Sequence, residues 1–86
     1  MHVHGIGVAG TLQSNDCLVR VEPFSKIEVT LESSVKNEFG DHIEHLIREN
    51  LSRNDITHCK VTIEDKGALD CTIIARLQTA IERSQG

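Results

Sequence analysis

The chain has 86 residues, which is the length of one small domain, and we expect residues 1–86 to fold as a single unit. A net charge of −4 and only two aromatic side chains argue against nucleic-acid binding, which needs a basic face or stacking platforms. No apolar run approaches the ~18 residues of a membrane-spanning helix, so no membrane partner is expected.

Residues 1–7 are rich in Gly and His and lack the pattern of a secretory signal, so we expect them to be loosely held. Val8–Leu12 predicts a short strand. Gln13–Asp16 (QSND) predicts a turn, because Asn and Asp tolerate left-handed backbone and bond their own main chain. Cys17–Glu22 alternates between apolar and polar residues and predicts a second strand, which Pro23–Ser25 ends.

The clearest amphipathic strand is Ile27–Leu31, where Ile, Val and Leu alternate with Glu and Thr. We expect it to pair with the preceding strand as an antiparallel hairpin with one wet face, and its Leu31 side chain to be buried. A helix should follow, with Ser33 or Ser34 as its N-cap and Asn54-Asp55 at its end. Its apolar stripe has helical spacing and consists of Val35, Phe39, Ile43, Leu46, Ile47 and Leu51.

Cys59–Glu64 alternates again and predicts another half-buried strand, with Ile63 on the apolar face. Asp65–Gly67 should turn the chain, with Asp65 or Gly67 as a helix cap. A second helix is then predicted by apolar residues that recur every four positions, at Leu69, Ile73, Leu77 and Ile81.

The strand–helix–strand unit from Ile27 to Glu64 should cross over right-handed, which makes its two strands parallel. Both helices must bury their stripes on one apolar face. The predicted fold class is therefore α+β, a two-layer sandwich of a small mixed β-sheet with two helices packed on one face.

Ser14 is the candidate functional residue, because it projects from a tight turn between two strands, where an attached group could swing freely. By pattern alone, a serine in a turn is most often only a turn residue. The other serines have local explanations: a strand break for Ser25, helix capping for Ser33 and Ser34, a helix end for Ser52 and a frayed tail for Ser84.

The remaining candidates favour structural interpretations. Metal binding by the histidines is disfavoured, because no Cys or carboxylate stands at ligand spacing from any of them; they are His2, His4, His42, His45 and His58. Asp41 and Glu44 could be paired for acid–base work, but acidic residues on a helix face are usually just solvated.

The three cysteines are an odd number without CxxC spacing, which argues against a disulfide framework or a zinc site and favours reduced, cytosolic thiols. Cys17 follows Ser14 by three residues, but its alternation places it on the apolar face as a small hydrophobe. We expect Cys59 and Cys71 to lie in apolar faces as well. No catalytic motif is recognisable, which is typical of a passive module.

Several segments carry a family resemblance. Val8–Asp16 reads VAGTLQSND and resembles the prosthetic-group segment of citrate lyase acyl carrier proteins, roughly AGT-L-x-S-x-D. Ser33–Val35 with Phe39–Asp41, and Asp65–Cys71 (DKGALDC) with Ala75–Leu77, resemble the same family in the same order.

The resemblance implies that Ser14 carries 2'-(5''-phosphoribosyl)-3'-dephospho-CoA through a phosphodiester, with a terminal thiol that holds acetyl or citryl. It also implies a non-catalytic subunit of the cytoplasm. Its partners would be the transferase (alpha) and lyase (beta) subunits of citrate lyase, which exchange acetyl for citryl and release oxaloacetate, and the prosthetic-group transferase that attaches the arm.

Three alternatives stay open. A malonate decarboxylase carrier subunit would keep Ser14 but change the acyl group, although the DKGALD segment favours citrate lyase. A small interaction module would carry no prosthetic group. A stand-alone enzyme is the third possibility, and the absence of catalytic motifs argues against it.

Overall fold

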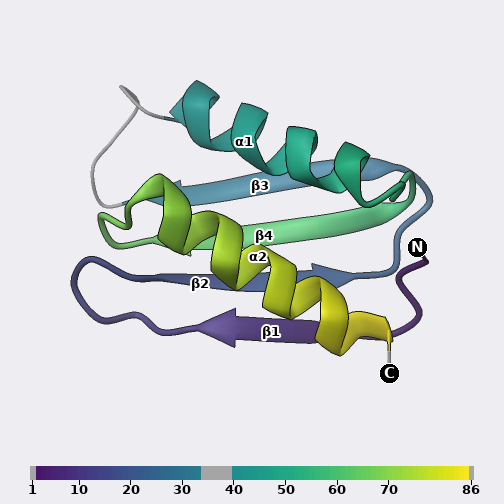
Figure 1. The fold of residues 1–86 in the computed structure, drawn as a ribbon, viewed down its shortest axis with the longest axis horizontal. Helices are drawn as coiled ribbons and strands as arrows, with labels where there is room; N and C mark the ends of the chain where they lie inside the picture. Colours follow the sequence, from purple (N-terminus) through teal and green to yellow (C-terminus); the bar gives the residue numbers. More distant parts are fainter. Residues whose placement is uncertain (1, 34–39, 86) are drawn as a thin grey trace.

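The computed structural model describes residues 2–33 and 40–85, which form one sheet and two helices in two layers (Figure 1). The elements follow the predicted order: β1 (Gly7–Gly10), β2 (Cys17–Glu22), β3 (Ile27–Ser33), α1 (Gly40–Arg53), β4 (Cys59–Asp65) and α2 (Asp70–Gln85). Both helices cover the same face of the sheet, with α1 packed on β3 and α2 packed on β1 and β2. The predicted α+β sandwich is confirmed.

The strand order is β1-β2-β4-β3, so the strand before α2 lies inside the sheet. β3 and β4 are parallel, as predicted, with Leu31 opposite Ile63. The predicted hairpin between β2 and β3 is wrong. β2 instead pairs antiparallel with β4, with Val19 opposite Ile63, and with β1 on its other side. β4 can lie between two other strands because every second residue along its whole length is buried.

The core lies between the sheet and the helices. Its fully buried strand residues are Cys17, Val19, Val21, Cys59, Val61 and Ile63, which confirms the alternation on β2 and β4. The apolar residues of β3 are only partly buried because β3 is an edge strand, so the expectation of a buried Leu31 is not met.

The first helix is described from Gly40 onward, so the predicted roles of Ser34, Val35 and Phe39 lie outside the described residues. Ser33 ends β3, and its predicted role as N-cap also rests on residues outside the described ones. The helix ends as predicted at Asn54-Asp55. Asp55 has a φ of 56°, and the Ile56 N–H donates to the Leu51 carbonyl at 3.0 Å. The helix therefore closes as a Schellman motif, in which a residue in left-handed conformation is followed by a backbone hydrogen bond that spans six residues.

The C-terminal end of the second helix is bonded to the segment that precedes β1. Ser84 is fully buried rather than frayed, and its carbonyl accepts bonds from the N–H groups of His4 and Gly5 at 3.1 and 2.9 Å. α2 also lies very close to β1. A Cβ on Gly7 would lie only 1.9 Å from the Ala80 carbonyl oxygen. Gly7 therefore lets α2 rest directly on the backbone of β1.

Candidate functional site

Ser14 lies exposed in the connection between β1 and β2. The connection closes where the Thr11 N–H donates to the Cys17 carbonyl at 3.2 Å, and Gly10 reaches that point with a φ of 102°. Asn15, next to Ser14, has a φ of 66°, the left-handed backbone expected of this turn. None of the hydrogen bonds among the described residues uses the Ser14 hydroxyl.

Asp16 fixes this loop to the second helix. Its carboxylate accepts two bonds from the Arg76 guanidinium, both at 3.0 Å, and one each from the Thr11 hydroxyl and the Cys17 N–H, both at 2.7 Å. These donors, Arg76 first, stabilise the anion and lower the pKa of Asp16 to about 2. The bidentate geometry also fixes the orientation of the two side chains.

A second support comes from the connection between β4 and α2. The Asn15 N–H donates to the Lys66 carbonyl at 2.8 Å, and the Lys66 N–H donates to the Asp16 carbonyl at 2.9 Å. Asp65 shapes that connection by accepting bonds from the N–H groups of Gly67 and Ala68. The residue after Ser14 is thus held by backbone bonds while the Ser14 side chain itself points to solvent.

The predicted helix cap is different from the one observed. Asp65 bonds the turn that follows β4, whereas the carbonyl of Leu69 accepts the first helical bonds, from Thr72 and Ile73. Leu69 therefore lies at the start of α2 with 70% of its surface exposed, and its predicted place in the buried stripe is wrong.

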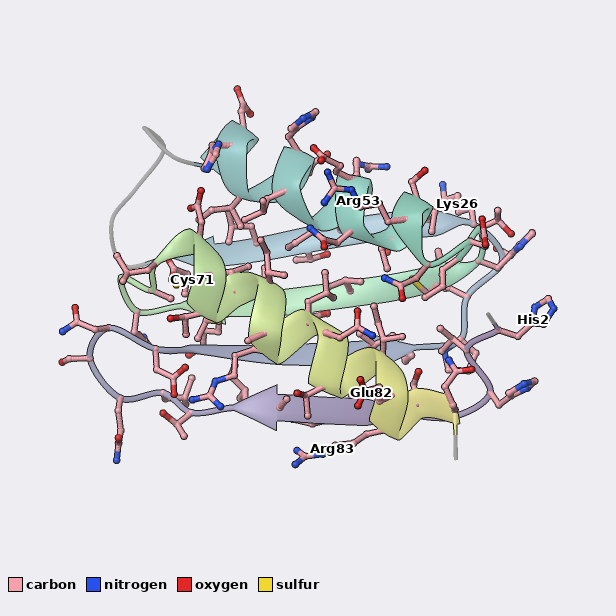
Figure 2. The ribbon with its side chains drawn as sticks, viewed as in Figure 1. His2, Lys26, Arg53, Cys71, Glu82 and Arg83 are labelled. Carbon is pink, nitrogen blue, oxygen red and sulfur yellow. The ribbon has the colours of Figure 1, made fainter. Side chains whose placement is uncertain are left out.

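A cavity of about 560 Å³ opens beside the β1–β2 connection that carries Ser14. It lies between the start of α1, the β4–α2 connection and the first turn of α2. Its lining is mainly apolar and consists of His42, Ile43, Asp65, Gly67, Ala68, Leu69, Asp70, Cys71 and Ile73. Figure 2 shows Cys71 at the beginning of α2, at the same end of the molecule as the β1–β2 loop.

The three cysteines differ in environment. Cys17 and Cys59 are buried, and burial raises the pKa of each thiol to about 11. Cys71 is exposed, so its predicted place in an apolar face is wrong. Cys71 lies in the first turn of α2 and is not among the residues that this helix buries against the core.

The other candidates make contacts that do not include Ser14. His42 contacts Asp70 at 2.7 Å and His45 contacts Glu49 at 3.4 Å, while Glu44 pairs with Arg48 in solvent. Within the described part of the chain, no three His, Cys, Asp or Glu side chains are arranged to hold a metal ion. Across residues 2–33 and 40–85, neither helix has the length and apolar character needed to cross a membrane.

Sequence reasoning missed the support of the loop. Thr11, Asp16 and Arg76 lie within the segments that resemble the family. Asp16 and Arg76, however, are 60 positions apart in the chain, so their pairing is not a local pattern. The available signal was an acidic residue directly before the buried strand residue Cys17, since a carboxylate at that depth needs a partner.

Known proteins are similar to this chain over most of its length. The family described as "Malonate decarboxylase delta subunit (MdcD)" matches residues 5–84. A citrate lyase acyl carrier protein of Treponema denticola is 52% identical over 84 residues, which cover 98% of this chain and 97% of that protein. This chain belongs to the family of citrate lyase acyl carrier proteins.

Other members of the family are similar over nearly the same length. The Haemophilus influenzae relative is 46% identical over 98% of this chain and 88% of its own, and that of Rhodopseudomonas palustris is 53% identical over 90% and 80%. Among solved structures, a chain of a Pseudomonas malonate decarboxylase hetero-tetramer in complex with malonate is similar, with a TM-score of 0.79 and 25% identity. The similarity covers 93% of this chain and 84% of that one.

Proposed function

We propose that this chain is the acyl carrier subunit of a citrate lyase, with Ser14 as the attachment residue of a 2'-(5''-phosphoribosyl)-3'-dephospho-CoA arm. The observation that carries the proposal is an exposed serine hydroxyl on a loop that the Asp16–Arg76 pair holds in place. When bound, the arm supplies a thiol for acetyl and citryl groups. The described residues supply a rigid base, because the loop on which Ser14 lies is bonded to the β4–α2 connection and to α2.

The residues around Ser14 fit such a group. The Ser14 oxygen would form the new bond to phosphorus, its proton would pass to a base of the modifying enzyme, and the bond to the donor's leaving group would break. The resulting phosphodiester is an anion. It would lie close to Asp16, whose own charge is already matched by Arg76 at 3.0 Å, so repulsion between the two anions is reduced.

The partners proposed are the transferase (alpha) and lyase (beta) subunits and a prosthetic-group transferase, with the chain itself non-catalytic and cytoplasmic. The hetero-tetramer that contains the similar solved chain supports a multi-subunit assembly. A net charge of −4 suits docking on basic surfaces, and thiols that are all free suit a reducing compartment.

The test is co-expression with the prosthetic-group transferase, followed by intact mass and by citrate cleavage in the reconstituted complex. Ser14→Ala should fold, because an exposed turn hydroxyl contributes at most about 1 kcal/mol, but it should gain no mass and support no cleavage. Ser25→Ala and Ser52→Ala are matched controls, since both serines are also exposed and should leave modification unchanged. A Ser14→Ala protein that still gains the mass of the arm would refute the assignment.

A second candidate function is that of a malonate decarboxylase carrier, which the family description and the similar solved chain favour. It keeps Ser14 and changes only the acyl group. Loaded protein offered to citrate lyase subunits with citrate, and to malonate decarboxylase subunits with malonate, separates the two. We expect turnover with citrate; turnover with malonate alone would support the second candidate.

A further inference from the structure

We propose that the cavity beside the Ser14 loop holds the uncharged pantetheine portion of the arm between encounters with partner subunits, when the arm ends in a free thiol or an acetyl group. This inference rests on the proposed function, because it requires an arm on Ser14. It adds a binding site on the carrier itself.

The first argument is proximity. Gly67 belongs to the wall of the cavity, and a Cβ on it would lie 3.7 Å from the Asn15 side-chain oxygen. Asn15 is the neighbour of Ser14 and is fixed to Lys66 by a 2.8 Å backbone bond. The edge of the cavity is therefore one residue from the attachment point. The phosphate and nucleoside portions of the arm join the pantetheine portion to Ser14, and a tether that spans this separation gives it a high effective concentration, so even weak contacts can hold it.

The second argument is the character of the wall. A volume of about 560 Å³ lies within the range of small-ligand pockets, which are mostly apolar with a few polar groups. The apolar members are Ile43, Ala68, Leu69 and Ile73. Leu69 is 70% exposed at the start of α2, and a linear chain of methylene, methyl and amide groups would cover it.

The third argument is charge. Two carboxylates, Asp65 and Asp70, belong to the wall, and His42 contacts Asp70 at 2.7 Å. Such a wall disfavours the phosphates of the arm and the carboxylates of a citryl group, because like charges repel at short range. It accepts a neutral thiol or acetyl end. The citryl-loaded arm should therefore stay outside the cavity, while the acetyl-loaded arm withdraws into it.

Cys71 provides a direct readout, because it lies in the wall and is exposed, whereas Cys17 and Cys59 are buried. Its alkylation by iodoacetamide is followed by peptide mass spectrometry in the apo, acetyl-loaded and citryl-loaded protein. Acetyl loading blocks the arm thiol, so only Cys71 is read. We expect alkylation about fivefold slower in the acetyl-loaded form, the value for a cavity filled about four-fifths of the time. The citryl-loaded form should react at the apo rate.

A matched pair of variants tests the wall. Leu69→Asn removes apolar surface from the cavity and introduces a favoured N-cap, so the helix start is retained. Leu12→Asn makes the same change at another exposed leucine, in the Ser14 loop and outside the cavity wall. Protection of Cys71 in the acetyl-loaded protein should be lost in Leu69→Asn and kept in Leu12→Asn.

Intact mass distinguishes the two proposals. Absence of the arm's mass on Ser14 refutes the proposed function. Full loading combined with equal Cys71 alkylation in the apo and acetyl-loaded proteins refutes this inference alone. Protection that appears only after the large subunits are added also overturns it, because the cavity would then be the seat of a partner.

Discussion

One substitution tests how strongly the stability of the protein depends on the close approach between β1 and β2 at the base of the Ser14 loop. Gly10→Ala would place a Cβ 1.8 Å from the Cys17 carbonyl oxygen, far inside contact distance, at a φ of 102°. The strands would have to separate, and the bond from the Thr11 N–H to the same oxygen would be lost.

The magnitude follows from four contributions. Left-handed backbone costs a non-glycine residue about 1–2 kcal/mol, overpacking against backbone costs about 1–3 kcal/mol, and the lost hydrogen bond costs about 0.5–1.5 kcal/mol. Reduced freedom of the unfolded chain returns about 0.4–1 kcal/mol. The free energy of unfolding should therefore fall by about 1.5–6 kcal/mol, a large part of the stability of a small domain.

Gly67→Ala is the matched control. Gly67 also has a positive φ, 88°, but its Cβ would meet the nearest atom, the Asn15 side-chain oxygen, at an ordinary 3.7 Å. Only the backbone cost applies, offset by the unfolded state, so the loss should be about 0–1.5 kcal/mol. Urea unfolding followed by circular dichroism measures both variants. Equal losses for Gly10→Ala and Gly67→Ala would show that the close approach at Cys17 does not constrain the loop.

Three further predictions concern charge, thiols and packing. The folded pKa of Asp16, about 2, lies below its ordinary 3.8, so its contribution to stability is present above pH 3.8 and lost as the pH falls through 2. The stability difference between wild type and Asp16→Asn, from urea unfolding at each pH, should therefore shrink between pH 5 and pH 2; a constant difference would contradict the assignment. At pH 8, Ellman's reagent should titrate Cys71 alone in the folded protein, and Cys17 and Cys59 only after urea is added, because burial raises the pKa of both to about 11; fast reaction of all three would contradict their burial. Ile63→Ala should lower the free energy of unfolding by about 2–5 kcal/mol because Ile63 is fully buried, and a loss below about 1 kcal/mol would show that the core can close around the change.

The sequence predicted every strand and helix because alternation and helical spacing are local properties. It could not predict strand order, because β2 and β3 have compatible apolar faces whether they pair directly or leave room for β4. Neighbouring strands in sequence pair often, but here the fully apolar alternation of β4 places it in the interior of the sheet.

The sequence predicted an exposed position for the candidate residue Ser14, but it did not predict the support of its loop. Ser14 follows from the turn pattern and from the resemblance, whereas the Asp16–Arg76 pair depends on how α2 lies across β1 and β2. For Leu69 the sequence pattern predicted burial, which is wrong. Its four-residue spacing to Ile73 predicted burial, but the helix begins after it, so the periodicity does not extend to its side chain.

The bonds from His4 and Gly5 to the Ser84 carbonyl bring the two ends of the described chain together, and Figure 1 places both ends opposite the β1–β2 loop. The molecule is longest in one direction, at 31 Å, and the loop and the ends lie at its two poles. A purification tag, a fluorophore or a fused domain on either end would therefore sit away from Ser14. A short peptide joining the ends is also feasible, so a circularised carrier with an unobstructed loop can be made from this fold.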